Sequence, residues 1–297
     1  TGMISKILGN YLISKGKITP EQLNDVLEEI TRVRVKLGLI AVAEGMITQE
    51  QADKINRLQA VMDKRFGDIA VIKGYLTEKQ VDELLRLQGN PYLAFAQALE
   101  NLNLMKITEL DDMMRQYQAE NEFTNSSMED LKSDDVDRVL PLFLPPDAAE
   151  YLDMVGVVLR TMMRCVDNNV MPMKAYFDKQ YLADNGAMQL VEGEKPVTCA
   201  FAGNGQALLP TASCFGHEEF EKVDEDALDA VAELINCING LYASDMSQQR
   251  IEMELCPPEF SASISGFYSE KMLVLPIEVY GETVQVLITI GNSLEMR

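Results

Sequence analysis

Four residues in the last third of the chain have types and a spacing that could do chemistry together. Asp229, Glu233, Asn236 and Gly240 follow one another at intervals of four, three and four residues. In a helix with 3.6 residues per turn such positions lie side by side on one face. A carboxylate, an amide and bare backbone would share one patch, with Glu233 and Asn236 as the candidate catalytic pair. Groups of this kind work by holding a reactant in position.

The same stretch carries a second, apolar stripe, which predicts a helix with one buried face. This stripe consists of Leu228, Val231, Ala232, Ile235, Ile238 and Tyr242. Asn and Gly are poor helix formers, so their presence on the polar stripe costs roughly 1 kcal/mol or more of helix stability. That cost favours a functional role. The alternative is an ordinary solvated face, because Glu-x-x-Asn by itself is common on helices.

The elements that must position this patch form an α+β domain. An apolar stripe from residue 148 to 166 predicts an opening long helix, and a second long helix begins near Asp224. Alternating apolar residues predict strands, the last two joined by the hairpin Tyr280-Gly281-Glu282. The predicted strands are 175–181, 187–191, 197–201, 251–255, 272–279 and 283–290, with a short helix at 208–215. We therefore expect an antiparallel sheet with two long helices.

The wider pattern around the four residues carries a family resemblance. The motif is followed by Pro257-Pro258, preceded by the segment Ala212-Ser-Cys-Phe-Gly-His-Glu-Glu-Phe, and closed by a predicted hairpin from Leu275 onward. These parts, in this order over about half the chain, resemble the CheC/CheX/FliY family of bacterial chemotaxis phosphatases. The chain has one such motif and the opening helix has none, so the domain looks CheX-like.

This resemblance implies an activity and roles for the residues. A CheX-like domain dephosphorylates the aspartyl phosphate of a CheY-type response regulator. Asn236 would hold the attacking water, and Glu233 would pair with the receiver's active-site lysine. Asp229, Gly240 and Pro258 would support docking. The chain would contribute no cofactor and no metal site, because magnesium comes with the receiver. Homodimerisation through sheet edges also follows from the resemblance.

The first hundred residues are an internal repeat. Gly9, Gly38 and Gly67 are spaced by 29 residues, and a second glycine follows each after seven residues. These second glycines begin Gly-Lys-Ile-Thr, Gly-Met-Ile-Thr and Gly-Tyr-Leu-Thr, in which glycine suits a helix end and Thr the next N-cap. Each unit is predicted to be a short helix, a glycine turn and a longer amphipathic helix. A fourth unit has Ala96 and Asn103 in the glycine positions.

Two of these units resemble the MshEN-like N-terminal domain of type II secretion and type IV pilus ATPases. Some members of that family bind cyclic di-GMP. The matching positions are Lys36, Leu37 and Gly38 with Gln59, and Arg65, Phe66 and Gly67 with Gln88. The resemblance implies a nucleotide site at these residues. The alternative is that the repeated residues hold together a helical adaptor, as most repeat arrays serve as interaction surfaces.

Composition sets the remaining limits. We expect a helical-repeat domain at 1–118, a polar acidic linker at 119–146 and the CheX-like domain at 147–297. A net charge of −21 disfavours nucleic-acid polymers and anionic membranes as partners. No apolar run reaches the roughly 20 residues of a membrane span, so a cytoplasmic protein is expected. A single histidine, His217, and five widely spaced cysteines leave little for histidine triads or zinc sites.

Three functions follow from these patterns. The first is an aspartyl-phosphate phosphatase whose N-terminal repeats bind a partner or cyclic di-GMP. The second is a non-catalytic signalling adaptor that binds a receiver domain or cyclic di-GMP. The third is a structural scaffold.

Overall fold

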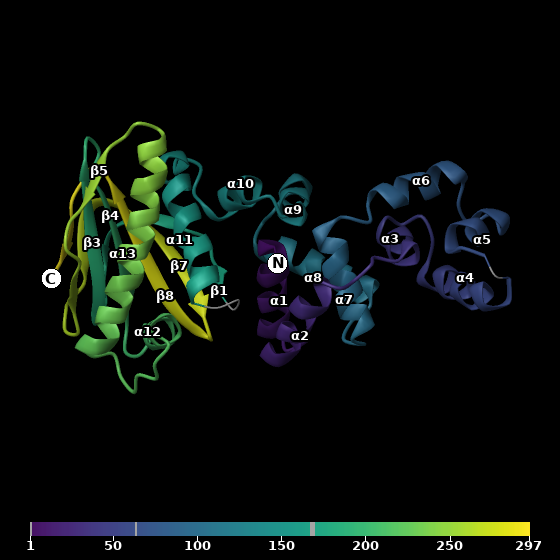
Figure 1. Cartoon of the computed structure of the whole chain (residues 1–297), viewed down its shortest axis with the longest axis horizontal. Coiled ribbons are helices and arrows are strands. Elements are labelled where there is room, and N and C mark those ends of the chain that lie inside the picture. Colours follow the sequence, from purple (N-terminus) through teal and green to yellow (C-terminus); the bar gives the residue numbers. More distant parts are fainter. Residues whose placement is uncertain (1, 63, 167–169) are drawn as a thin grey trace. The chain divides into compact units, whose positions relative to one another are not determined.

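The computed structural model describes residues 2–62, 64–166 and 170–297, and the chain divides into two compact units. Unit 1 ends at Arg138 and unit 2 begins at Val139. In the described part of unit 1 the regular elements are helices, whereas unit 2 combines helices with a sheet (Figure 1).

Helices α1 to α8 of unit 1 form four consecutive pairs, each with a tight turn between its members. The pairs are α1 (Met3–Ser14) with α2 (Pro20–Ile30), α3 (Leu37–Ala43) with α4 (Gln49–Met62), α5 (Phe66–Ile72) with α6 (Glu78–Arg86), and α7 (Pro91–Asn101) with α8 (Ile107–Glu120). In the first three turns glycine adopts φ between +67° and +72°. Asn103 adopts φ +54° in the fourth, as its place in the repeat predicts.

A threonine begins the second helix in each of the first three pairs. Thr19 and Thr77 form capping boxes with Gln22 and Gln80, and each side-chain oxygen lies 3.2 Å from the glutamine backbone nitrogen. Thr48 makes the same 3.2 Å contact with Gln51. These reciprocal bonds satisfy backbone donors that the first helical turn leaves free.

The pairs do not pack in chain order, because α2 packs against α7, which joins the first pair directly to the fourth. The rings of Tyr11 and Tyr117 meet edge to face with centroids 4.9 Å apart, and Lys15 forms an ion pair with Glu120. Helix α7 explains this order, since most of its side chains are apolar and buried. A helix that is apolar all round needs neighbours on every side.

The first glycine of each of the first three repeats allows two helices to approach closely. A Cβ atom on Gly9 would lie 2.2 Å from Leu23, and one on Gly67 would lie 2.9 Å from Val81. In the second unit the residue equivalent to Leu23 and Val81 is Ala52, which is shorter. A Cβ atom on Gly38 would instead lie 2.9 Å from Cε2 of Phe66. These glycines therefore have a packing role.

The segment expected to link the two domains contains helices. They are α9 (Asn125–Lys132), α10 (Val136–Val139) and the 3₁₀ helix η1 (Leu140–Phe143). Met128 and Leu131 of α9 are buried. Asp134 accepts a 2.7 Å hydrogen bond from the backbone nitrogen of Ile4, and this contact ties the end of unit 1 to the start of α1.

Unit 2 is α+β with an antiparallel sheet, as predicted, and the sheet is curled. Its strands follow the order β1-β7-β8-β4-β3-β5, while β2 and β9 also pair with β7, and β6 pairs with β3. The strands are β1 (Val170–Pro172), β2 (Tyr176–Tyr181), β3 (Asn185–Gly193), β4 (Val197–Gly203), β5 (Met253–Leu255), β6 (Glu259–Ser261), β7 (Phe267–Val279), β8 (Glu282–Ile290) and β9 (Leu294–Met296). The helices are η2 (Ala149–Tyr151), α11 (Leu152–Cys165), α12 (Leu209–Gly216) and α13 (Glu225–Gln248).

The predicted hairpin joins β7 to β8. Val279 pairs with Glu282, and the two residues between them, Tyr280 and Gly281, have φ of +50° and +82°. Positive φ at both central residues is the signature of a type I′ turn, whose twist matches that of the flanking strands. Strands β7 and β8 are consequently held in register by a local turn, and β4 pairs with β8 on its other side.

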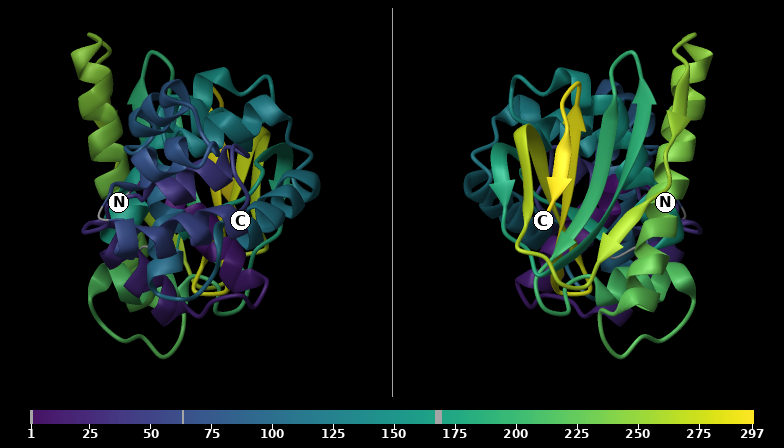
Figure 2. Two further views of the ribbon diagram at one scale, coloured as in Figure 1. Left: turned by 90° about the vertical axis from the view of Figure 1, so that its right-hand side faces the viewer. Right: turned by 90° about the vertical axis from the view of Figure 1, so that its left-hand side faces the viewer.

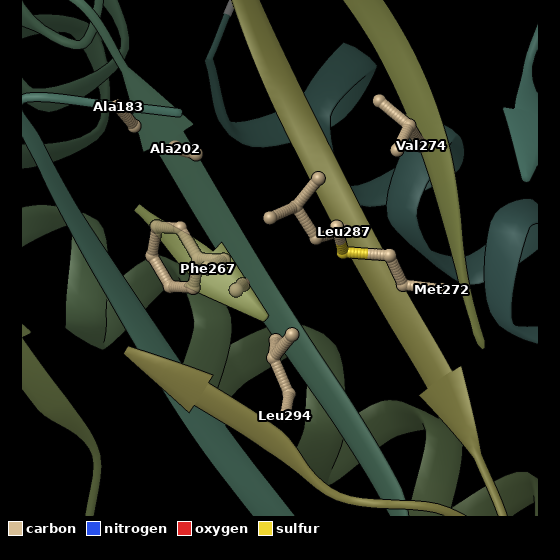
Figure 3. Close-up of a cluster of buried hydrophobic side chains, with 8 residues drawn as sticks. Ala183, Ala202, Phe267, Met272, Val274, Leu287 and Leu294 are labelled. Atoms are coloured by element: carbon tan, nitrogen blue, oxygen red, sulfur yellow. The ribbon is translucent and has the colours of Figure 1, made fainter. Parts of the chain in front are cut away.

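Helices α11, α12 and α13 lie on one face of this sheet (Figure 1). We call it the helix face. The opposite face is turned to the viewer in the right-hand view of Figure 2. There a compact cluster of buried apolar side chains gathers around Phe267, Leu287 and Met272 (Figure 3). Both faces of the central strand β4 are therefore buried.

Among the described residues, none of the helices has the length and apolar character needed to cross a membrane.

Candidate functional site

Helix α13 carries the candidate site, and its sequence explains where it starts and how it lies. Asp224 is the N-cap, and its side chain accepts a 3.2 Å hydrogen bond from Ala227. The predicted apolar stripe is buried throughout, so the core face assigned from the sequence is confirmed. This face packs on the sheet and on α11 and α12. The helix is thereby fixed over strand β3.

The predicted polar stripe of α13 runs beside this core face and reaches solvent. Asp229 and Glu233 are exposed, whereas Asn236 and Gly240 are half-buried. Within the part of the chain that the structure describes, the Glu233 carboxylate makes no hydrogen bond or ion pair. The structure thus places the four predicted residues on one accessible side of one helix.

Two exposed residues of α13 close to the predicted stripe were not predicted as members of the site. Cys237 is exposed beside Glu233, and the apolar side chain of Leu241, next to Gly240, is 42% exposed. Desolvation, with smaller contributions from Cys165 and Glu233, raises the pKa of the Cys237 thiol. The thiol is therefore neutral at physiological pH. Because only the thiolate form of cysteine is a good nucleophile, this environment does not favour Cys237 as a nucleophile.

Gly240 has no packing reason to be glycine. A Cβ atom built at this position meets no other atom within 4 Å, in contrast to the tight glycines of unit 1. Glycine inside a helix costs roughly 0.5–1 kcal/mol relative to alanine. The chain bears this cost in the middle of a 24-residue helix without an internal contact to compensate it.

Asn236 is anchored by a buried amide network that the sequence did not reveal. Gln189 of β3 points to the helix face, and its Nε2 donates to Oδ1 of Asn236 and to the carbonyl oxygen of Cys256, both at 2.8 Å. Nδ2 of Asn239 donates to Oε1 of Gln189 at 2.9 Å. Gln189 is 2% exposed and Asn239 is fully buried. The available signals were a lone Gln in an apolar strand and a lone Asn on the apolar side of a helix.

The proline pair shapes the strand edge where this network ends. Pro257 and Pro258 stand between β5 and β6, which both pair with β3, and the register shifts by one residue across the break. Proline has no N–H to continue the ladder. In this gap the Cys256 carbonyl accepts from the Gln189 side chain. Pro258, predicted to support docking, is half-buried beside the gap.

The predicted nucleotide residues of unit 1 lie where the second helix pair (α3 and α4) meets the third (α5 and α6). Lys36 and Arg65 are exposed, and the Phe66 ring packs on Gly38. Gln88 donates to the carbonyl of Val35 at 2.8 Å. Gln59 makes a longer, 3.4 Å contact with the carbonyl of Lys64. Gly67 lines a shallow pocket of about 490 Å³ between α5 and α6, and Leu37 is half-buried at the start of α3.

Both glutamines therefore hold the chain just before a helix of the repeat, which is a structural role. Cyclic di-GMP binding at these residues stays a prediction. As for metals, the described residues contain no cluster of three or more His, Cys, Asp or Glu side chains suited to hold an ion.

No protein-family model matches the chain, and no curated protein matches it. Solved structures that are similar to it are CheX and CheC-like chemotaxis proteins. CheX from Vibrio vulnificus is 13% identical, with a TM-score of 0.41 over 48% of this chain and 99% of that one. A CheC-like superfamily protein from Shewanella sp. PV-4 is 17% identical, with a TM-score of 0.40 over 46% and 97%. A chain of the CheX–CheY–BeF3–Mg complex from Borrelia burgdorferi is 18% identical, with a TM-score of 0.37 over 46% and 95%.

Proposed function

We propose that this protein is a CheX-like phosphatase that hydrolyses the aspartyl phosphate of a CheY-type receiver domain. The observation that carries the proposal is the solvent-facing side of α13, where Glu233, Asn236 and Gly240 lie together while the other side of the helix is fixed in the core. This is the arrangement that a docking helix needs if it is to insert side chains into the site of another protein.

The rate of this reaction depends more on how the reactants are positioned than on covalent chemistry by the protein. Water attacks the phosphorus atom, the bond between phosphorus and the aspartate oxygen breaks, and the products are a free carboxylate and dihydrogen phosphate. Both protons of the water end on the phosphate. Phosphoryl transfer is dominated by in-line positioning and charge stabilisation. Asn236 is proposed to hold the water through its amide, and the receiver's own magnesium to neutralise the phosphoryl oxygens.

Glu233 is proposed to pair with the active-site lysine of the receiver. Its carboxylate is exposed and, within the described chain, not engaged in an ion pair, so a cation brought by a partner can reach it. A charged hydrogen bond of this kind would fix the register of the two proteins. We call the side of α13 that carries Glu233, Asn236 and Gly240 the docking face. Asp229 and Pro258 would support it, and Gly240 would allow the partner's backbone to come close.

The test is phosphate release from a phosphorylated CheY-type receiver. We expect the protein to accelerate release, and Glu233→Ala and Asn236→Ala to lose about 100-fold or more of that acceleration, since misplacing a reactant costs this much. Asp245→Ala, an exposed carboxylate farther along α13, is the matched control and should keep full activity.

A second outcome would assign a different function. If the protein binds receivers from the same genome without accelerating release, and both variants bind as well as the parent, it is a non-catalytic signalling adaptor. Acceleration that survives in both variants would overturn the proposed pair.

A further inference from the structure

The buried amides behind Asn236 form a chain whose hydrogen-bond direction is set by its two ends. One end is the Cys256 carbonyl oxygen, which only accepts and lies 2.8 Å from Gln189. The Gln189 atom at this contact must therefore be its NH₂ group. Its second N–H then points to Asn236, at 2.8 Å.

The other end gives the same answer independently. The side chain of Asn239 approaches the Oε1 atom of Gln189 at 2.9 Å and the backbone carbonyl oxygen of Gln189 at 3.4 Å. A backbone carbonyl only accepts, so Asn239 presents its NH₂ group, and the Gln189 atom that receives it must be Oε1. Both backbone carbonyls thus require one orientation of the Gln189 amide.

The consequence falls on Asn236. Because Gln189 offers it a donor, Asn236 turns its Oδ1 inward, and its Nδ2 is left on the other side of the amide. This Nδ2 donates to none of the described residues and is not among the buried polar atoms that lack a partner. It therefore remains in reach of solvent as a hydrogen-bond donor on the docking face.

We infer that Gln189 is a positioning residue that fixes which atom of its amide group Asn236 presents to the phosphoryl group of a docked receiver. The inference rests on the proposed phosphatase function. A donor at this place holds the attacking water through a lone pair of the water oxygen, whereas a flipped amide would present an acceptor that binds the water through one of its protons instead. Gln189 is 2% exposed and lies on a strand that is paired on both sides. Its own amide therefore has little freedom to turn, and it continues to offer Asn236 a donor.

Gln189→Glu is the sharpest variant. It keeps the size of the side chain and an acceptor for Asn239, but a protonated carboxyl has one donor where the amide has two, and a carboxylate has none. We expect the kcat for dephosphorylation to fall about 10- to 100-fold. The affinity for a receiver carrying beryllofluoride should change less than twofold, because Gln189 does not touch the partner. Gln97→Glu makes the same substitution at a buried glutamine of unit 1 and should leave kcat unchanged.

A second measurement keeps the inference falsifiable if Gln189→Glu folds poorly. In the NMR spectrum of the unliganded parent protein, both side-chain amide protons of Gln189 should be protected from exchange with water. In Asn236→Ala one of the two should lose protection. This signature requires no receiver and no turnover.

The outcomes separate the two proposals. Protected Gln189 protons with a fall in kcat at constant affinity support the positioning role. An unchanged kcat in a folded Gln189→Glu protein, or exchange-labile Gln189 protons in the parent, overturns it while leaving the phosphatase intact. If the parent releases no phosphate from any receiver, the proposed function fails and the positioning role with it, and protected protons then mark a purely structural network.

Discussion

Asn236 and Gln189 are joined by a 2.8 Å hydrogen bond between residues that lie 47 positions apart in the chain. One residue stands on the accessible side of α13 and the other inside the sheet. The candidate site therefore extends from the surface of a helix into the core of the domain. Glu233, one helical turn before Asn236, has no such anchor and stays exposed.

Replacing Gly240 by alanine should make the protein more stable and a poorer ligand for its receiver. The new Cβ atom meets no other atom within 4 Å, so the helix should gain about 0.5–1 kcal/mol of unfolding free energy. On the docking face the same methyl group should raise KM. Urea unfolding and receiver titration measure the two effects, with Gln248→Ala as the control on the same helix. A more stable variant with an unchanged KM would show that partners do not approach Gly240 closely.

Replacing Gly38 by alanine should destabilise unit 1 through the ring of Phe66. A Cβ atom at this position would lie 2.9 Å from Cε2 of Phe66, and overpacking of this kind costs about 1–3 kcal/mol. The cost should shrink in a Phe66→Leu background, where the ring is absent. Gly89→Ala, where the added atom meets nothing, is the control. Equal costs in both backgrounds, measured by thermal unfolding, would contradict the packing role.

Glu278 should make stability fall as the pH rises. Burial raises the pKa of this half-buried glutamate, so the folded state binds the proton more tightly than the unfolded state does. Its contribution is complete below the unfolded pKa of about 4.3 and is lost as the pH rises through the higher folded value. Glu278→Gln should therefore melt higher than the parent at pH 7 and close to it at pH 4. The exposed Glu282→Gln serves as control, and a constant difference across this range would refute the prediction.

The repeats should bind cyclic di-GMP if their second and third units act as the resemblance implies. Calorimetry on the full chain should then give heat that is lost in Lys36→Ala and in Arg65→Ala, because both cations are exposed and free to reach a phosphate or guanine. Lys79→Ala, an exposed lysine on α6, should keep it. The absence of heat from the parent protein would leave these residues with their packing roles alone.

Patterns within short segments and the 29-residue repeat predicted most of the fold. The 29-residue repeat, the positive-φ turns, the buried side of α13 and the β7–β8 hairpin all follow from local spacing, and the structure bears them out. Strands β1, β6 and β9 were missed because three residues carry no readable alternation. Helix α9 was missed because Met128 and Leu131 are its buried apolar residues in an otherwise polar segment.

Contacts between distant segments were beyond such patterns. Packing of α2 on α7 depends on surfaces that four similar repeats share, so spacing alone does not select the partner. The Gln189 network joins residues from β3, α13 and the proline gap, and each of them by itself is one polar residue among apolar neighbours. Glu233 and Asn236 could be chosen from the sequence because they belong to one helix.

The contact between Gly38 and Phe66 also limits how the repeats could be multiplied. Phe66 opens the unit after the one that contains Gly38, and it supplies the bulk that Leu23 and Val81 supply within their own units. A tandem duplication of residues 37–65 would put Leu37 in the place of Phe66 and leave a gap beside the first copy of Gly38. The second and third units are thus matched to each other at this contact, and inserting a unit between them would require a compensating substitution there.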